Sequence, residues 1–211
     1  MRNFSKLDNF LGRTNELLNT ISSKRDSNAN YPASNVSEGE MNEKERKLSA
    51  SLMRINHSGE IAAQGLYIGH AFISKNEDQK NLMLDIAEEE KDHLFWCKKR
   101  IEELGGKTSV FDSAWYCGSV LIGIMSGVYN DKVGLGFVEE TEKQVSRHLD
   151  GHLEKIPTND HKTREILLQM RADENKHGEL AASKGSIEIP NLVKELMSKV
   201  SKIMINISYR F

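Results

Sequence analysis

The sequence predicts an all-α fold, a bundle of long helices. Only 3 of the 211 residues are proline, whereas the helix-favouring Glu, Lys, Leu, Ile and Met are frequent. From Asn42 onward the apolar residues recur with a helical period. No Asn-Gly or Asp-Gly pair separates two alternating runs, as a β-hairpin would require, since Asp150-Gly151 lies inside a helical pattern.

Turn signals divide the helical part of the chain into six segments. The breaks are Ser74–Asp78, Gly105-Gly106, Pro157–Asp160 and Gly185–Pro190, and Asn130-Asp131 is a start signal. They predict long helices over 42–73, 79–104, 131–156 and 161–184, a shorter apolar helix over 113–129, and a C-terminal helix over 190–208.

The region before the first long helix differs in composition. Residues 1–21 carry a weak amphipathic pattern, and residues 22–40 are rich in Ser, Asn, Pro and Gly. Such a stretch is typical of a linker or mobile loop. We therefore predict an N-terminal segment with a flexible linker over 1–40 and one helical domain over 41–211, a normal domain size.

Composition narrows the classes of protein. Lys plus Arg number 29 and Asp plus Glu 31, so the basic excess of a nucleic-acid binder is missing. Cys97 and Cys117 form no CxxC, which favours free thiols in a reducing compartment. Residues 1–18 are polar, without the apolar core of a signal peptide. These features predict a cytoplasmic protein that binds no nucleic acid.

Two histidines follow a glutamate at the third position, in Glu90-Lys91-Asp92-His93 and Glu174-Asn175-Lys176-His177. On a helix, residues i and i+3 share a face, so both side chains of each motif can reach one ion. Two Glu-x-x-His motifs, each joined by a glutamate from a neighbouring helix, are the ligand set of di-iron and di-manganese bundles.

Helix geometry locates the two further glutamates. In an antiparallel hairpin, ligands at one height lie equally far from the turn, because the rise per residue is fixed. Glu60 and Glu90 have their midpoint at residue 75, inside one break, and Glu142 and Glu174 at residue 158, inside another. Both hairpins thus place their glutamates about 20 Å from the turn. The predicted metal ligands are Glu60, Glu90, His93, Glu142, Glu174 and His177.

Helix phase favours the same residues. Glu142 is the carboxylate in an otherwise apolar stripe with Val138, Val145 and Leu149, whereas Glu139 and Glu140 lie off that stripe and are predicted to be solvated. An unpaired buried carboxylate is costly, and two divalent ions would compensate four of them.

The alternative is that these groups form buried Glu–His salt bridges or lie on exposed faces. It is the better explanation for either motif alone, but not for six residues with both midpoints at turns. For the other histidines we expect surface or outer-sphere roles, with an outer-sphere contact conceivable for the two that follow Glu142 on its helix. They are His57, His70, His148, His152 and His161.

The connection between the hairpins specifies the topology. His93 and Glu142 are 49 residues apart, far more than a short turn needs. A hairpin, a length-spanning crossover and a second hairpin form the one-crossover, ferritin-like four-helix bundle. The apolar helix 113–129 belongs to that crossover.

The types of ligand limit which metal ions the site would bind. Carboxylate and imidazole without thiolate suit iron or manganese better than copper(I) or structural zinc. Iron is favoured because such bundles commonly activate dioxygen, although the ligands alone admit manganese.

Two apolar segments carry information about the surroundings of the bundle. Eighteen uncharged residues between Asp112 and Asp131 fall short of a secure membrane span. The C-terminal helix combines an apolar face with Lys194, Lys199 and Lys202, which fits a helix in a membrane interface. Simple coverage of the bundle, or a subunit contact, explains both segments equally well.

Four motifs in order resemble a known family. They are Arg54-Ile55-Asn56-His57-Ser58-Gly59-Glu60, Glu88-Glu89-Glu90-Lys91-Asp92-His93, Gly136-Phe137-Val138 with Thr141-Glu142, and Asp173-Glu174-Asn175-Lys176-His177. Together they resemble the bacterial demethoxyubiquinone hydroxylases of ubiquinone biosynthesis, over nearly the whole chain except the linker. All six predicted ligands match the pattern of that family.

The resemblance implies a flavin-independent di-iron monooxygenase with two iron ions per chain, bound peripherally to the cytoplasmic face of the bacterial inner membrane. Its substrate would be a polyprenyl methoxy-methyl-benzoquinol, hydroxylated with dioxygen and a reductant, for which NADH is a candidate. It implies that Glu90 and Glu174 bridge the irons, with Glu60, His93, Glu142 and His177 terminal. The resemblance leaves open whether the chain forms a homo-oligomer.

Two other functions compete with this interpretation. The first is a ferritin-like iron-storage or peroxide-handling protein, which the apolar outer helices disfavour because a soluble cage needs polar outer faces. The second is a non-catalytic assembly protein of the quinone-biosynthesis complex, which we would expect to have lost ligands.

Overall fold

A computed structural model of the chain describes residues 30–211 together with residues 8, 11, 12 and 15, and over these residues the fold is all-α, as predicted. Six helices lie within residues 30–211: α2 (Glu43–Ile73), α3 (Glu77–Glu103), α4 (Asp112–Tyr129), α5 (Asp131–Leu153), α6 (His161–Ser183) and α7 (Asn191–Arg210). Their bounds agree with the predicted ones to within about three residues, the third long helix ending earlier than expected.

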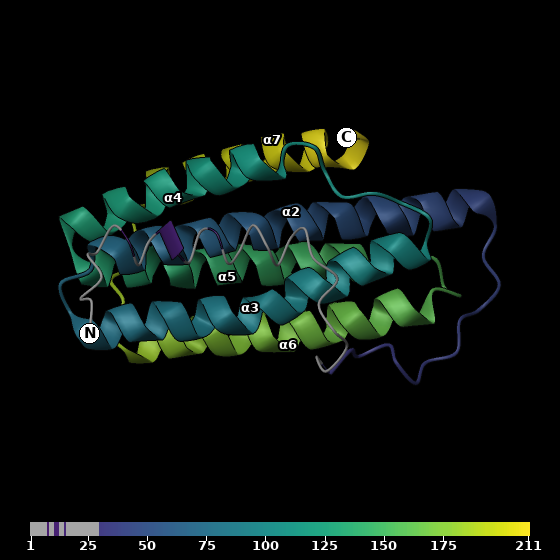
Figure 1. The fold of residues 1–211 in the computed structure, drawn as a ribbon, viewed down its shortest axis with the longest axis horizontal. Coiled ribbons are helices and arrows are strands. Elements are labelled where there is room, and N and C mark those ends of the chain that lie inside the picture. The colour runs from purple at the N-terminus through teal and green to yellow at the C-terminus, as the bar shows by residue number, and fades with distance from the viewer. Residues whose placement is uncertain (1–7, 9–10, 13–14, 16–29) are drawn as a thin grey trace.

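The bundle consists of two antiparallel hairpins, α2 with α3 and α5 with α6 (Figure 1). α4 belongs to the crossover between them and lies along α2, and α7 returns along the same side of the bundle. This is the one-crossover topology that the spacing of the motifs predicts.

Local sequence fixes where the helices start. Asn42 accepts from the backbone N–H groups of Lys44 and Glu45, and the Glu45 carboxylate accepts from the Asn42 N–H, which completes a capping box. Asn130 ends α4, and its side chain accepts from the Lys132 N–H to start α5. The sharp change of direction between the crossover and the second hairpin therefore depends on this one residue.

Part of the predicted linker is described, and it packs on the bundle. Residues 30–42 contain no helix, but Tyr31 and Ala33 are buried. Glu38 forms an ion pair of 2.6 Å with the buried Arg100 of α3. The amphipathic pattern predicted over residues 1–21, and most of the predicted linker, lie outside the described residues.

Two apolar clusters occupy opposite ends of the four-helix core. One includes Met53 of α2 and Leu167 of α6, and the other includes Tyr67 of α2 and Leu135 of α5. On each of the four helices, the predicted ligands lie between the residues that enter the two clusters. A polar site is thus enclosed between two apolar ones.

Small residues let α4 approach α2 closely. A Cβ built on Gly123 would lie 2.2 Å from the Leu66 carbonyl oxygen, and one on Gly69 would lie 2.3 Å from the Val120 carbonyl oxygen. Neither position can accept a side chain unless the helices separate. The glycines of the apolar segment therefore hold the crossover helix against the first helix of the bundle.

This contact predicts that Gly123→Ala destabilises the protein by about 1–3 kcal/mol, because the added methyl group meets backbone rather than a mobile side chain. Thermal unfolding followed by circular dichroism measures the change. Gly118→Ala is the matched control, since a Cβ there meets nothing within 4 Å and alanine favours the helix. Equal stability of the two variants would contradict the close packing.

Candidate metal centre

The structure brings all six predicted ligands together at mid-height of the bundle. Their potential ligand atoms form two groups, each within 4.8 Å, which share Glu90 and Glu174. Glu60 and His93 complete one group, and Glu142 and His177 complete the other. All six residues are at most 3% exposed. The cluster could therefore hold two neighbouring cations, with two carboxylates common to both.

Each histidine presents Nδ1 to the cluster. Nδ1 of His93 lies 2.7 Å from Glu90 Oε2 and 3.3 Å from Glu174 Oε1. Nδ1 of His177 lies 2.9 Å from Glu90 Oε1. The two hairpins contribute matching sets, so the site has an approximate two-fold arrangement that repeats the internal repeat of the sequence.

The other nitrogen of each ring faces a second carboxylate. Nε2 of His93 lies 3.4 Å from Asp173, and Nε2 of His177 lies 3.0 Å from Glu89. Asp173 of α6 directly precedes the shared Glu174, and Glu89 of α3 directly precedes the shared Glu90. An acid of each hairpin therefore orients a histidine of the other hairpin. Such outer partners fix the tautomer and the orientation of a metal-binding imidazole.

The sequence interpretation did not single out Asp173 or Glu89. The signal was present, because an acid precedes each Glu-x-x-His motif. An acid beside a glutamate on an exposed helix face carries little information by itself, so only the geometry gives it meaning.

Tyr67 was also not assigned a role from the sequence. Its fully buried hydroxyl donates to Oε1 of Glu142. On the same face of α2, the Gln64 amide donates to the Ala87 carbonyl oxygen of α3. These contacts hold α2 in register with α5 and α3 beside the cluster. In the sequence, the only indication of a role for Tyr67 was that it shares a helical face with Glu60 and Gln64.

When both histidines are neutral, the cluster fits cations rather than salt bridges. Since Nε2 of each histidine donates outward, a neutral ring directs only the Nδ1 lone pair at the carboxylate oxygens. Within residues 30–211, several inward atoms have no hydrogen-bond partner despite these short separations: both oxygens of Glu90, Nδ1 of His93 and His177, Oε2 of Glu142 and Oε1 of Glu174. Two divalent ions would satisfy these lone pairs and balance the charge of the four carboxylates.

Without cations, the cluster must hold protons. Burial, followed by repulsion from Glu90, raises the pKa of Glu60 well above its usual range, and the pKa of Glu174 to about 7. Burial and repulsion from Glu174 raise the pKa of Glu142. The pKa of Glu90 is lowered, because the two imidazoles beside it outweigh its burial.

The histidines respond in the opposite direction. The pKa of His177 rises to about 9 and that of His93 rises well above its usual value, because contacts with Glu90 outweigh the opposing effect of burial. Protons and cations therefore compete for the same atoms, as they do in any carboxylate–histidine metal site.

Two glutamates next to Glu142 test the prediction that only the residue in the apolar stripe of this helix is a ligand. Glu139 and Glu140 lie outside both ligand groups, as predicted. The expectation that Glu140 is solvated is wrong, because it is 8% exposed and pairs with Arg147 at 3.3 Å and Lys194 at 3.8 Å. α7 covers this side of α5, which the local pattern could not reveal.

The remaining histidines have separate environments. The buried His57 lies 3.0 Å from Asp112 and links α2 to the start of α4, and the buried His70 packs on Gly134. His148 and His152 pack edge to face, with ring centroids 4.0 Å apart. Burial lowers the pKa of His148 to about 4, so its ring is neutral near pH 7. His161 begins α6 and is exposed.

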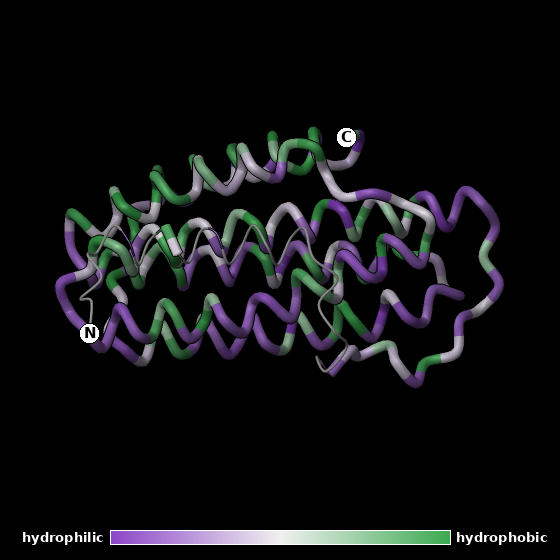
Figure 2. Tube along the Cα trace, in the orientation of Figure 1, coloured by the Kyte–Doolittle hydropathy of each residue, from purple (hydrophilic) through white to green (hydrophobic). Residues whose placement is uncertain are grey.

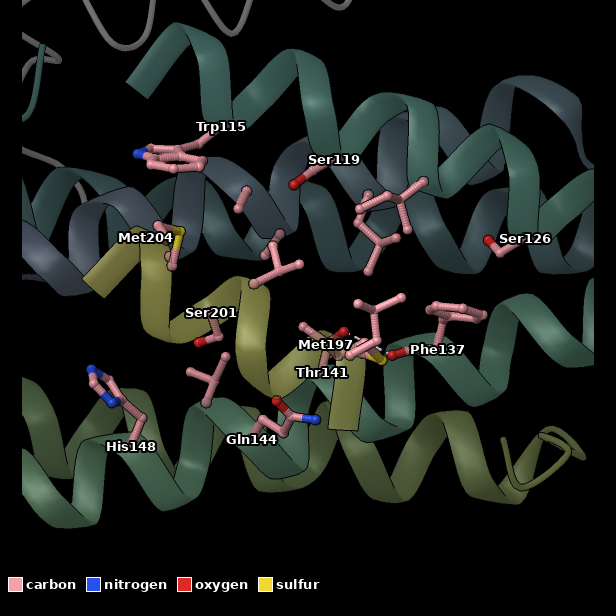
Figure 3. Close-up of a pocket in the computed structure, with 18 of the residues that line it drawn as sticks. Trp115, Ser119, Ser126, Phe137, Thr141, Gln144, His148, Met197, Ser201 and Met204 are labelled. Carbon is pink, nitrogen blue, oxygen red and sulfur yellow. Dashed lines mark hydrogen bonds between the residues drawn. The ribbon is translucent and has the colours of Figure 1, made fainter. Parts of the chain in front are cut away.

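A cavity of about 510 Å³ lies beside the cluster, between α2, α4, α5 and α7. Its lining is mostly apolar and includes Glu60 of the cluster, Phe137 of α5 and Met197 of α7. Figure 3 shows side chains of the crossover helix and the C-terminal helix facing one another across this space. The two apolar segments singled out in the sequence thus form walls of a cavity that extends to the candidate metal centre.

The outer faces of the same two helices are apolar and exposed. Leu121 and Val128 of α4 are 62% and 66% exposed, and Leu192 and Ile203 of α7 are 77% and 56% exposed. Figure 2 shows how densely apolar residues gather along α4, compared with the mixed pattern of α3 and α6. Within the described part of the chain, no helix has the length and hydropathy to cross a bilayer.

Comparison with known proteins agrees with the sequence interpretation. A family model described as ubiquinone biosynthesis protein COQ7 matches residues 47–208. A protein of Legionella pneumophila (strain Lens) named 3-demethoxyubiquinol 3-hydroxylase is 44% identical over 211 residues, 99% of each chain. A protein of the same name from Coxiella burnetii (strain RSA 331 / Henzerling II) is 44% identical over 208 residues, 99% of this chain and 97% of the other.

The geometry predicts a graded response of metal binding to substitution. We expect about two irons per chain in the native protein. Glu142→Ala should lose most of this iron, because a buried ligand atom is removed. Asp173→Ala should weaken iron binding about 10- to 100-fold, because His93 loses its outer partner. Iron content after dialysis against graded chelator measures both.

Glu139→Ala is the control, since Glu139 contacts Lys143 and Ser186 outside the cluster. Native iron affinity in the Glu142 variant, or loss of iron in the Glu139 variant, would contradict the assignment.

Proposed function

Because the chain belongs to the COQ7 family of ubiquinone biosynthesis proteins, we propose that it is a di-iron monooxygenase that hydroxylates demethoxyubiquinol. The substrate is a benzoquinol ring that carries methoxy, methyl and polyprenyl groups. In the reaction, one atom of dioxygen replaces the remaining ring hydrogen as a hydroxyl group, and the other atom leaves as water. Two electrons come from a reductant, for which NADH is a candidate, and NADH would supply one of the two protons needed while water supplies the other.

In this proposal the six clustered side chains hold two irons. Glu90 and Glu174, common to both groups of ligand atoms, would be shared by the two ions, and Glu60 with His93 and Glu142 with His177 would each hold one of them. Such a pair of irons, when bound, supplies the electrons and the Lewis acidity for dioxygen activation. The buried carboxylates and their outer partners fix its position, and the flanking apolar clusters exclude water from it.

The observation that carries the proposal is the apolar cavity that extends to Glu60. Its volume lies in the range of small-molecule sites. A quinol with a polyprenyl tail is apolar over most of its surface and needs an apolar route to a shielded site. An iron-storage protein has no use for such a cavity, which favours quinol hydroxylation over storage.

The second part of the proposal concerns location. We place the outer faces of α4 and α7 in the interface of the membrane, on the cytoplasmic face of the bacterial inner membrane. Exposed leucine, isoleucine and valine on these faces support this, together with Lys199 and Lys202 beside them on α7. A substrate dissolved in the bilayer could then enter between the two helices that wall the cavity.

Genetic complementation tests the activity. Cells that lack this enzyme should accumulate demethoxyubiquinone, and the native chain should restore ubiquinone. Glu60→Ala and His177→Ala should fail to restore it, because each removes a proposed ligand. Quinones extracted from the cells and separated by mass report the outcome.

Substitutions at the two cysteines are the control. Cys97 is buried and Cys117 is exposed, and both are free thiols outside the ligand set, so Cys117→Ser and Cys97→Ser should restore ubiquinone. If the ligand-deficient chains cleared the intermediate, a non-catalytic assembly role would replace the enzymatic one.

Vesicle binding tests the membrane proposal. Replacing Leu121, Leu192 and Ile203 together by serine should lower binding to phospholipid vesicles by tenfold or more, because each buried methylene contributes about 0.8 kcal/mol. None of the three lines the cavity. Cosedimentation measures binding, and Glu165→Ser, an exposed position on α6, should leave it unchanged. Unaltered binding by the triple variant would refute the placement.

A further inference from the structure

Three residues that line the apolar cavity each carry a buried polar atom without a hydrogen-bond partner. The atoms are Oδ1 of Asn56, Nε1 of Trp115 and Nε2 of His148, none with a hydrogen bond to any described residue. An unpaired buried polar atom costs about 1–3 kcal/mol, so native proteins keep few without a reason. A ligand in the cavity is such a reason.

Asn56 is the most informative of the three. It is 4% exposed, and its amide nitrogen has only a weak contact, 3.8 Å from the sulfur of Met53. Asn56 lies one turn before Glu60 on α2, and both line the cavity. A ring that bonds to Asn56 would therefore lie within about 6 Å, along the helix axis, of the cluster that holds the candidate metals.

Contacts between helices place Asn56 near Trp115. Ser58 donates to Asp112 at 2.6 Å, which places the first turn of α4, and with it Trp115, beside the Asn56 turn of α2. In Figure 3, Trp115 and His148 lie toward one end of the cavity, with Met204 near them, and Phe137 lies toward the other. Met125 and Val133 are apolar members of the lining that lie further along α4 and α5 from Trp115 and His148, and the polar Ser126 also lies toward the Phe137 end (Figure 3).

The donors and acceptors define what would fit. Oδ1 of Asn56 only accepts and Nε1 of Trp115 only donates, while the neutral ring of His148 can do either. The complement is an aromatic ring with at least one hydroxyl donor and further oxygen acceptors. A methoxybenzenediol has these groups, and an isoprenoid chain has none of them.

We propose that Asn56, with Trp115 and His148, forms the subsite for the hydroxylated ring of the substrate, and that the end near Phe137 holds its isoprenoid chain. The inference rests on the proposed quinol substrate and identifies the part of the cavity that binds the ring. Asn56 accepts from a ring hydroxyl and holds the ring beside Glu60. The end near Phe137 has a mostly apolar lining, so it binds the isoprenoid chain mainly through dispersion contacts and contributes little to recognition of the ring.

Binding to the protein loaded with iron(II) under argon tests the subsite apart from turnover, because hydroxylation needs dioxygen. Iron-loaded full-length protein is dialysed against two probes: 2-methoxy-5-methyl-6-geranylbenzene-1,4-diol and geranyl methyl ether, which lacks the ring. We expect Asn56→Leu to raise the Kd of the diol about tenfold and to leave that of the ether unchanged. Met197 lies in the wall of the cavity on α7, so Met197→Ala should raise the Kd of both probes.

Further variants and turnover separate this inference from the proposed function. Asn56→Ser, which shortens the side chain without adding an apolar group, should also raise the Kd of the diol and leave that of the ether unchanged. Circular dichroism verifies that the variants are folded. If the native chain hydroxylates the quinol but both Asn56 variants keep native Kd and KM, the subsite is wrong and the function stands. If the diol binds through Asn56 and no hydroxylation occurs, the subsite stands and the hydroxylase function falls.

Discussion

Four carboxylates buried within a few ångströms of one another are the constraint on which the rest of this structure depends. In an apolar interior such a set cannot stay fully ionised without compensating positive charge. The raised pKa values of Glu60 and Glu142, and the lowered pKa of Glu90 beside two imidazoles, describe how protons take up that role when cations do not. Two divalent cations would satisfy the same atoms at once, which explains why a helical core retains so many acids.

The bundle is arranged to keep this site rigid and dry. Apolar clusters close it at both ends, and each hairpin supplies an acid that orients a histidine of the other hairpin. The two hairpins are therefore coupled through the site as well as through their apolar faces. Local softening of one hairpin would disturb the ligands of both candidate cations, so the stability of the core and the geometry of the site depend on each other.

The helices outside the four-helix core determine what can approach the site. α4 lies against α2 through glycine contacts, and α7 closes the space between α4 and α5. Their inner faces line the cavity and their outer faces expose apolar side chains. The same two helices thus connect the surface most suited to a lipid interface with the candidate metal centre, consistent with a substrate that has a small reactive ring and a long apolar chain.

The sequence by itself determined the helices, the topology and the six clustered residues. Helix rise and phase are local and regular, so Glu60 and Glu90, equidistant from one turn, must meet if the hairpin forms, and likewise Glu142 and Glu174. Contacts between elements distant in the sequence were decided only by the tertiary structure. Asp173 and Glu89 look like ordinary surface acids until the hairpins pack, and Glu140 looks solvated until α7 covers it. Asn56 looks like any motif residue until packing buries its side chain beside the cavity. Periodicity specifies which face of a helix is buried, but the identity of the neighbour that buries it depends on packing across the whole bundle.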